Sequence, residues 1–366
     1  MKIEYDHQIF SMQRYGGISR YFANLQESLG DNKDFSYNAG ILYTRNHYLK
    51  DKRFLLPRVI GNRFLKKESK LYAWNKRYSR YMVRKNDFNV FHPTYYHTYF
   101  LNDLTKPFVL TVHDMIHELF PSYFSQNDPF VYFKRVLIEK ANHIIAISES
   151  TKNDIQRFFK IPDEKISVIY HGHKNDFSLS EEDSNDTIFN NYILYVGDRA
   201  AYKNFNLFIL AIAPLLKDRS EIRLICLGGG PFGYSEKELL YRHGIKEKQI
   251  HQLSVSDNQL KDFYKNALLF VYPSLYEGFG LPLLEAFANN CPIAASNTSC
   301  FPEVGGNAVV YFDPNDPDDI RSAIESVISN PTLADQLRVL GTEQLKKFSM
   351  DSCINQTQNV YKMFAR

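Results

Sequence analysis

Two carboxylates lie eight positions apart in the second half of the chain, with a Gly-Phe-Gly turn between them. They are Glu277 and Glu285. The apolar run before them, 268–272, predicts a buried strand, and the residues from Leu281 onward predict a helix. A turn from a strand into a helix points backbone N–H groups and the positive end of the helix dipole at one spot, which suits a phosphate. We expect Glu277 to accept hydrogen bonds from sugar hydroxyls beside that anion, and Glu285, about one helical turn in, to reach a ribose.

An ordinary strand–turn–helix unit with two surface glutamates is the simpler interpretation of this segment. The segment 276–286 reads Tyr-Glu-Gly-Phe-Gly-Leu-Pro-Leu-Leu-Glu-Ala, however, and resembles the E-x7-E signature of family 4 glycosyltransferases. The resemblance implies a GT-B fold, an α/β architecture in which two Rossmann-like doubly wound parallel-sheet domains face a cleft. It also implies that the departing diphosphate is stabilised by the backbone N–H groups of four consecutive residues, Gly278, Phe279, Gly280 and Leu281.

Three further segments are candidates for binding the donor. Gly16 and Gly17 open a predicted helix, where paired glycines let the backbone approach a ligand closely. Glycines in such a loop can also serve a tight turn alone, but the position resembles the family's N-terminal loop, which faces the donor diphosphate and the acceptor. Gly229 ends another predicted strand and is expected to line the nucleotide pocket. Val255 lies in a segment that resembles the one whose backbone meets the base in the family.

Two cations, Arg199 and Lys203, follow the predicted strand 193–196. Such cations can neutralise a diphosphate leaving group, which is the main electrostatic need when a nucleotide sugar is cleaved. Without further context they would be read as a pair of exposed basic residues. The resemblance assigns both to the pyrophosphate. Lys203 with Asn204 matches the usual Lys-Asn of the family, whereas Arg199 lies one position later than the commonest arrangement.

His113 ends a predicted apolar strand, and ligands of open α/β sheets gather outside the carboxyl ends of strands. The resemblance assigns His113 to the donor sugar. A metal site formed with His117 and the neighbouring carboxylates is the alternative, but no further ligand is identifiable, and we predict no metal. For His117 itself, a purely structural role is the alternative. The segment 316–318, Asp-Pro-Asp, is interpreted as a helix start and not as a metal–nucleotide motif.

The order of the predicted elements indicates two domains. Strand-like runs alternate with helical stretches, which is typical of parallel sheets in doubly wound domains, and a chain of 366 residues can bury two cores. We predict an N-terminal, acceptor-side domain over 1–175 and a nucleotide-sugar-binding domain over 191–350. The polar, acidic stretch within 176–190 is the predicted linker. The last segment, 351–366, is predicted to form a helix that packs back on the first domain.

Positive charge is concentrated in residues 45–87, which carry 14 basic and three acidic residues, whereas the whole chain has a net charge of only +3. Aromatic and apolar residues interleave with the cations over 63–85 and predict an amphipathic helix, which suits contact with anionic lipids. The alternative is a solvated basic face whose apolar stripe packs on its own domain. No nucleic-acid motif accompanies the segment, so a nucleic-acid partner is not expected.

Cysteine usage and hydropathy indicate where the protein works. The four cysteines show no C-x-x-C pairing, which favours a reduced, cytoplasmic setting. The sequence contains neither a secretory signal nor an apolar run of about 20 residues, the length needed to span a bilayer. We expect a cytoplasmic protein that is soluble or peripheral at the inner face of the plasma membrane.

The resemblance implies a retaining, metal-independent glycosyltransferase without a further cofactor. Its partners would be a nucleotide-sugar donor and a glycan or lipid-linked acceptor in bacterial surface-polysaccharide synthesis, including lipopolysaccharide and O-antigen. A GDP-sugar carrying mannose is the first interpretation of the donor and a UDP-sugar the second, and neither follows from the residues. One alternative is a catalytically silent, glycosyltransferase-like binding subunit. The other, an NAD-dependent oxidoreductase, is disfavoured because no G-x-G-x-x-G follows the first predicted strand.

Overall fold

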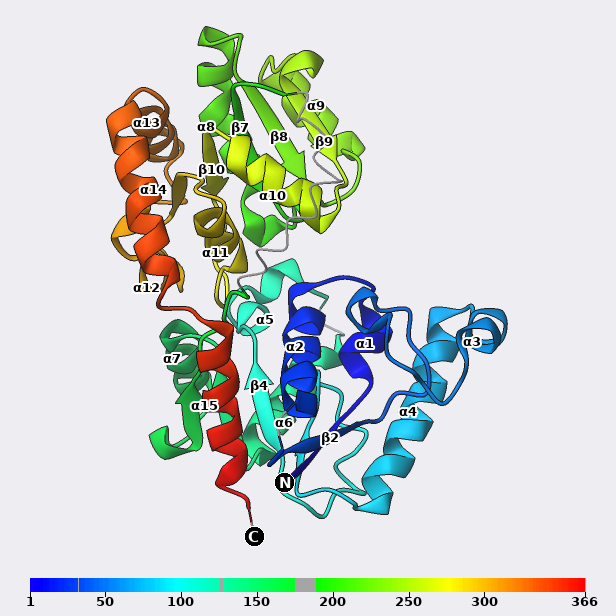
Figure 1. Cartoon of the computed structure of the whole chain (residues 1–366). Helices are drawn as coiled ribbons and strands as arrows, with labels where there is room; N and C mark the ends of the chain where they lie inside the picture. Colours follow the sequence, from blue (N-terminus) through cyan, green and yellow to red (C-terminus); the bar gives the residue numbers. More distant parts are fainter. Residues whose placement is uncertain (32, 126–127, 175–188, 366) are drawn as a thin grey trace. The chain divides into compact units, whose positions relative to one another are not determined.

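The computed structural model describes residues 1–31, 33–125, 128–174 and 189–365. The chain divides into two compact units (Figure 1). Unit 1 comprises Met1–His171 and the C-terminal residues from Asp351, and unit 2 comprises Gly172–Met350. Most of the predicted linker lies outside the described residues.

The described residues of unit 1 form six short parallel strands. They are β1 (Lys2–Tyr5), β2 (Ser36–Ala39), β3 (Val90–His92), β4 (Val109–Val112), β5 (His143–Ala146) and β6 (Ile166–Val168). They pair in the orders β2-β1-β3 and β4-β5-β6, and a parallel bridge between Phe91 and Phe108 joins the two sheets. The strand order therefore reverses between β1 and β3. In an open α/β sheet such a reversal leaves a crevice outside the carboxyl ends of the strands.

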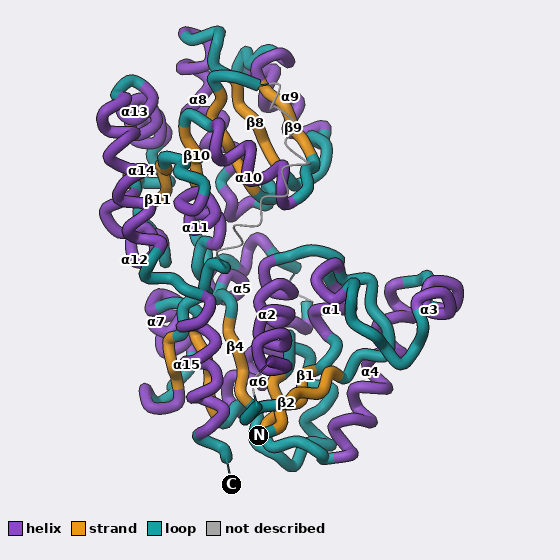
Figure 2. The backbone as a smooth tube through the Cα atoms, in the orientation of Figure 1, coloured by secondary structure: helices purple, strands orange, loops and turns teal. Residues whose placement is uncertain are grey.

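Helices flank these strands (Figure 2). They are α1 (Gln8–Met12), α2 (Gly17–Asp31), α3 (Arg58–Phe64), α4 (Glu68–Lys85), α5 (Ile116–Leu119), α6 (Pro129–Lys140), α7 (Glu149–Phe158) and α15 (Met350–Lys362). The predicted return of the C-terminal helix is visible in a buried hydrogen-bonded set. The hydroxyl of Tyr361 on α15 lies 2.8 Å from that of Tyr5 and 2.7 Å from Nδ1 of His92.

In unit 2 the described residues form a six-stranded parallel sheet with helices around it (Figure 2). Its strands are β7 (Tyr192–Val196), β8 (Arg223–Leu227), β9 (Ile250–Leu253), β10 (Leu269–Tyr272), β11 (Ile293–Ser296) and β12 (Val310–Phe312). Its helices are α8 (Phe205–Asp218), α9 (Tyr234–Arg242), α10 (Asp257–Asn266), α11 (Leu281–Ala288), α12 (Phe301–Gly305), α13 (Pro317–Ile328) and α14 (Pro331–Leu345). The order β12-β11-β10-β7-β8-β9 is that of a Rossmann sheet, which reverses between β7 and β10.

The predicted parallel α/β architecture is confirmed in both units, one local prediction needs correction, and two strands were missed. The amphipathic helix predicted over 63–85 is two helices, α3 and α4, because the chain turns at Leu65 and buries that side chain beside Tyr43 and Leu71. Strands β2 and β9 were not predicted, since Ser-Tyr-Asn-Ala and Ile-His-Gln-Leu lack an apolar run. Within the described part of the chain, no helix is long and apolar enough to cross a membrane.

Candidate active site

The chemistry-bearing loops of unit 2 follow the two strands between which its sheet reverses. The loop after β7 carries Arg199 and Lys203, and the loop after β10 carries Glu277. The N–H of Leu275 donates to the carbonyl of Tyr202 at 2.8 Å and ties the two loops together. Lys203 and Glu277 belong to separate motifs of the sequence. The strand order of the sheet brings them to the position where open α/β sheets bind ligands.

Lys203 and Glu277 form an ion pair at this reversal. The ammonium lies 2.6 Å from Oε1 of Glu277, and the two side chains are only 14% and 12% exposed. Burial would lower the pKa of Lys203, but the Glu277 carboxylate outweighs it and raises the pKa to about 12. The ammonium therefore keeps its charge at any physiological pH. The next residue, Asn204, adopts a φ of 59° and donates from its side chain to the carbonyl of Pro314 at 2.6 Å, which fixes the loop.

The Gly-Phe-Gly turn leads directly into α11, as the sequence predicts. Gly280 is the residue before the helix and has a φ of 84°, a left-handed conformation that favours glycine. Phe279 is 3% exposed and its ring packs 5.7 Å from that of Phe348, so it can offer a ligand its backbone only. Gly278 precedes it, and Leu281 is the first helical residue. Together these residues present the start of a helix whose dipole favours an anion.

Glu285 and Val255 occupy separate positions at the same sheet edge. Glu285 lies in the second turn of α11, half-buried, and its Oε2 accepts a hydrogen bond from the Tyr264 hydroxyl at 3.3 Å. Val255 lies in the loop between β9 and α10 and is also half-buried. That loop is held at its far end by Ser256, whose hydroxyl caps α10 by accepting from the N–H of Gln259. The ribose contact of Glu285 and the base contact of Val255 stay predictions.

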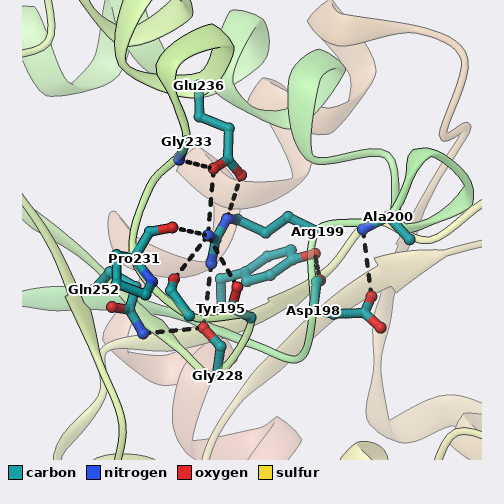
Figure 3. Close-up of polar contacts among 11 residues, drawn as sticks. Tyr195, Asp198, Arg199, Ala200, Gly228, Pro231, Gly233, Glu236 and Gln252 are labelled. Carbon is teal, nitrogen blue, oxygen red and sulfur yellow. Dashed lines mark hydrogen bonds and ion pairs between the residues drawn. The ribbon is translucent and has the colours of Figure 1, made fainter.

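Arg199 lies among backbone carbonyls and the Glu236 carboxylate (Figure 3), an environment different from that of Lys203. Its guanidinium donates to the Glu236 carboxylate and to the carbonyls of the turn after β8, including Gly228 at 3.1 Å and Gly230 at 2.8 Å. Gly229 lies between them, with a φ of 68°. A Cβ at Gly229 would lie 2.5 Å from Nη1 of Arg199. Arg199 and Gly229, predicted to contact the donor independently, are therefore parts of one cluster.

The remaining predicted residues lie in unit 1. Gly16 precedes α2 and Gly17 begins it. The same helix carries Tyr21, whose ring meets the His113 imidazole edge-on at a centroid distance of 5.7 Å. His113 follows β4, and its backbone N–H donates to the Tyr96 hydroxyl at 2.8 Å. The glycine pair and the histidine thus belong to neighbouring elements, although their motifs are nearly a hundred residues apart.

The His113 imidazole is buried and uncharged. Burial, helped by the His92 ring and the Lys134 ammonium, lowers the pKa of His113 to about 3. Neither ring nitrogen has a hydrogen-bond partner among the residues that the structure describes. A neutral imidazole of this kind can donate one hydrogen bond and accept another from a sugar hydroxyl. It cannot act as a cationic acid at neutral pH.

Two charged residues that contact the candidate site residues were missed by the sequence analysis. Lys134 on α6 is completely buried, and its ammonium lies 2.8 Å from Glu118 and 3.7 Å from Asp114, so it holds the segment that follows His113. Glu236 on α9 pairs with Arg199. Lys134 could have been suspected as a lysine in an apolar helix, whereas nothing around Glu236 distinguishes it from a surface residue. The predicted helix start at 316–318 is confirmed, because the Asp316 side chain caps α13.

The sheet order of unit 2 and its phosphate-suited turn are those of a nucleotide-binding α/β protein. Comparison with protein families is more specific. The chain matches the model of glycosyl transferases group 1 over residues 180–344 and that of glycosyltransferase family 4 over residues 15–176. The chain belongs to glycosyltransferase family 4, and the resemblance inferred from the sequence is confirmed.

Two curated relatives act on O-antigen. The chain is 31% identical to O-antigen chain mannosyltransferase B of Escherichia coli over 268 residues, which cover 70% of each chain. It is 32% identical to the O-antigen chain mannosyltransferase RfbU of Salmonella typhimurium over 223 residues. That second match spans 61% of the length of each protein.

Solved structures show the fold of the whole chain. Anabaena HepE, crystallised with UDP and glucose, is 15% identical and superposes with a TM-score of 0.74 over 99% of both chains. At this level of identity the likeness concerns the fold, which is GT-B, and the predicted fold class is confirmed.

Proposed function

We propose that the protein is a retaining, metal-independent glycosyltransferase that moves a hexose, mannose in the first instance, from a nucleotide sugar to a glycan or lipid-linked acceptor. The Lys203–Glu277 pair carries the proposal, because an ammonium and a carboxylate lie 2.6 Å apart at the sheet reversal, where they could meet a diphosphate and sugar hydroxyls. Family membership and the two O-antigen mannosyltransferase relatives support it. The acceptor would belong to bacterial surface-polysaccharide synthesis.

The proposed reaction breaks the bond between the sugar C1 and the β-phosphate oxygen. Lys203 and the backbone N–H groups of residues 278–281 would stabilise the departing diphosphate. The acceptor oxygen would attack C1 on the face that the diphosphate leaves, and the acceptor proton would pass to an oxygen of the released diphosphate. The anomeric configuration is then retained without a covalent enzyme intermediate.

Other side chains would position the donor and the acceptor. Glu277 would accept hydrogen bonds from the sugar hydroxyls, Glu285 from the ribose, and the neutral His113 would contact the sugar. The backbone at Val255 would meet the base. The start of α2, with its glycine pair, would meet the diphosphate and the acceptor.

Exposed apolar side chains within the basic segment 45–87 support a peripheral membrane contact from the cytoplasmic side. Val59 is 82% exposed and Phe64 is 58% exposed, and both lie on α3 among cations. Apolar side chains with surrounding lysine and arginine favour anionic lipid surfaces. The double variant Val59→Ser/Phe64→Ser should lose binding to phosphatidylglycerol vesicles, whereas Tyr234→Ser/Tyr241→Ser, which removes two exposed aromatic residues of unit 2, should keep it. Equal binding by both variants would exclude this contact.

Thermal unfolding against nucleotide sugars tests the proposed function. The panel contains GDP-, UDP-, ADP- and dTDP-sugars, NAD and NADP, without added metal. A donor at a hundred times its Kd should stabilise the native state by about 2.7 kcal/mol. We expect one nucleotide sugar, GDP-mannose first, to raise Tm. A response to NAD or NADP alone would identify an oxidoreductase instead, and no response to any compound would favour a silent binding subunit.

A further inference from the structure

The turn after β8 contains three consecutive glycines in left-handed conformations. Gly228, Gly229 and Gly230 have φ values of 90°, 68° and 70°. Glycine loses more conformational freedom on ordering than any other residue, so such a turn is costly to hold in one conformation. Its carbonyl groups also converge, and converging carbonyl dipoles repel one another unless a donor lies between them. A glycine turn that forms one wall of a binding pocket therefore needs an external brace.

We infer that Arg199 is that brace: it is a positioning residue for the Gly228–Gly230 turn and does not itself neutralise the donor diphosphate. The inference rests on the proposed function only in identifying the pocket as that of a nucleotide. It differs from the role that the sequence assigned to Arg199. Lys203 then remains as the one cation of the predicted pair that serves the leaving group.

The contacts of Arg199 use every nitrogen of its guanidinium (Figure 3). Nε donates to Glu236, and Nη1 donates to Gly228 at 3.1 Å. Nη2 donates to Gly230 at 2.8 Å and is also within 3.3 Å of the carbonyls of Gly229 and Pro231. The side chain is only 4% exposed. Because a guanidinium is a rigid planar fork, it cannot turn toward a phosphate without leaving several of these carbonyls at once.

The surroundings of the guanidinium reinforce this geometry. The Glu236 carboxylate balances its charge and also accepts from the N–H of Gly233 at 2.6 Å, which links the turn to the start of α9. The carboxylate is stabilised in its charged form. Burial would raise the pKa of Glu236, but the hydrogen bonds from Arg199 and Gly233 outweigh it and lower the pKa. The ring of Phe232 lies 4.8 Å from the guanidinium carbon, at the distance of a cation–π contact.

Lys203 is also paired with a carboxylate, but its surroundings differ from those of Arg199. The Lys203 ammonium donates to the Glu277 carboxylate. An ammonium carries three N–H donors on one atom. Lys203 lies at the reversal of the sheet, where the helix dipole of α11 also favours an anion. Arg199 is instead surrounded by carbonyl oxygens, which are a poor environment for a second anion. Gly229 supports the same conclusion, since only a residue without Cβ lets Nη1 approach this closely.

Amide hydrogen exchange of the full chain without nucleotide tests the brace directly. Arg199→Met and Glu236→Gln should each accelerate exchange over residues 228–233 by at least about tenfold, the effect of losing a buried charged hydrogen bond. Arg199→Lys should fall between these variants and the wild type. Arg242→Met is the matched control, since it removes an exposed arginine that pairs with Glu238 on α9, and should change nothing. Unchanged exchange in both Arg199→Met and Glu236→Gln would overturn the inference.

Nucleotide affinities separate the brace from a leaving-group contact. We expect Arg199→Met to lower the affinity for the nucleoside diphosphate and for the monophosphate by the same factor, measured with GDP and GMP or with UDP and UMP. It should raise the KM of the donor with little change in kcat. Lys203→Met should lower the affinity for the diphosphate more than the affinity for the monophosphate. Selective loss of diphosphate affinity in Arg199→Met would contradict the inference. If no nucleotide binds the wild type, the proposed function fails, while hydrogen exchange still decides whether Arg199 braces the turn.

Discussion

Both units place a carboxylate where their sheet reverses, but they give it different partners. In unit 2, Glu277 faces the Lys203 ammonium at 2.6 Å. In unit 1, the reversal lies between β1 and β3, and the donors to Asp6 that the described residues provide are neutral. They include the Thr94 hydroxyl at 2.6 Å, the Thr94 N–H at 2.8 Å, the Gln8 side-chain amide at 2.6 Å and the Tyr99 hydroxyl at 3.2 Å. Burial raises the pKa of Asp6 despite these hydrogen bonds.

The contrast extends to the other buried titratable groups of unit 1. Burial raises the pKa of Glu4 to about 7. It lowers the pKa of four histidines to about 3, namely His7, His92, His113 and His171. Lys134 with its carboxylates is the exception. Unit 2 holds an ion pair at its sheet edge, which suits a phosphate-bearing donor, whereas unit 1 holds neutral imidazoles such as that of His113, which suit sugar hydroxyls.

The largest effect is expected when the charge of unit 2 is removed. Lys203→Met should lower kcat of sugar transfer by about 10²–10³-fold, the range found when one donor to a developing anion is removed. The physical reason is that Arg199, the other cation of the predicted pair, is held by Glu236 and by the carbonyls of the turn after β8. Glu277→Ala should also lower transfer strongly, because it removes both the sugar contact and the partner of the ammonium. The measurement is steady-state transfer with the donor that the binding panel identifies.

A matched lysine controls for general loss of charge. Lys217→Met removes an exposed lysine from the last turn of α8 in the same unit. It should leave kcat and KM unchanged. Full activity in Lys203→Met would mean that the ion pair at the sheet reversal is only structural, and the contrast between the two units would lose its functional meaning.

A smaller effect is expected when a neutralised carboxyl of unit 1 is replaced. The pKa of Glu4 is about 7 in the folded chain against 4.5 for the unperturbed group, so the folded state holds the proton more tightly than the unfolded chain. The stability contributed by this protonation is complete below pH 4.5 and is lost as pH rises to 7, a loss of about 3 kcal/mol. Glu4→Gln cannot ionise, and should therefore lack this loss.

Trp74, the only tryptophan of the chain, lies on α4, so its fluorescence follows the unfolding of unit 1. Urea unfolding of the wild type and of Glu4→Gln at pH 4.5 and pH 8 isolates the contribution of the carboxyl, because the buried histidines are common to both. Glu27→Gln, on the exposed side of α2, is the control and should follow the wild type. Parallel pH dependence in wild type and Glu4→Gln would show that the folded chain tolerates the charge.

The difference between the units also separates what the sequence predicts from what it does not. Glu277 and Lys203 were found from motifs, since a carboxylate beside a glycine turn and a Lys-Asn after a strand are local patterns. Their pairing was not predicted, because it depends on β7 and β10 being neighbours, which is a property of the sheet order. The partners of Arg199 were not predicted for the same reason, since they lie some thirty residues further along the chain. Burial of Glu4 and Asp6 gives no local signal at all.

The smallest effect is expected in the pH profile: the pH dependence of the wild-type activity should contain no contribution from ionisation of His113. Its pKa of about 3 lies below the ordinary 6.5, so the folded chain loses stability as pH falls from 6.5 toward 3. The imidazole of the folded chain is neutral between pH 5.5 and 8. His113→Asn should lower kcat/KM by the same factor at every pH between 5.5 and 8, because the neutral ring and the amide both offer hydrogen bonds without charge. His243→Asn, at the end of α9 in unit 2, should leave the profile unchanged. If the ratio of wild type to His113→Asn instead varied with pH around 6.5, His113 would act as a charged group, and unit 1 would supply electrostatic stabilisation like unit 2.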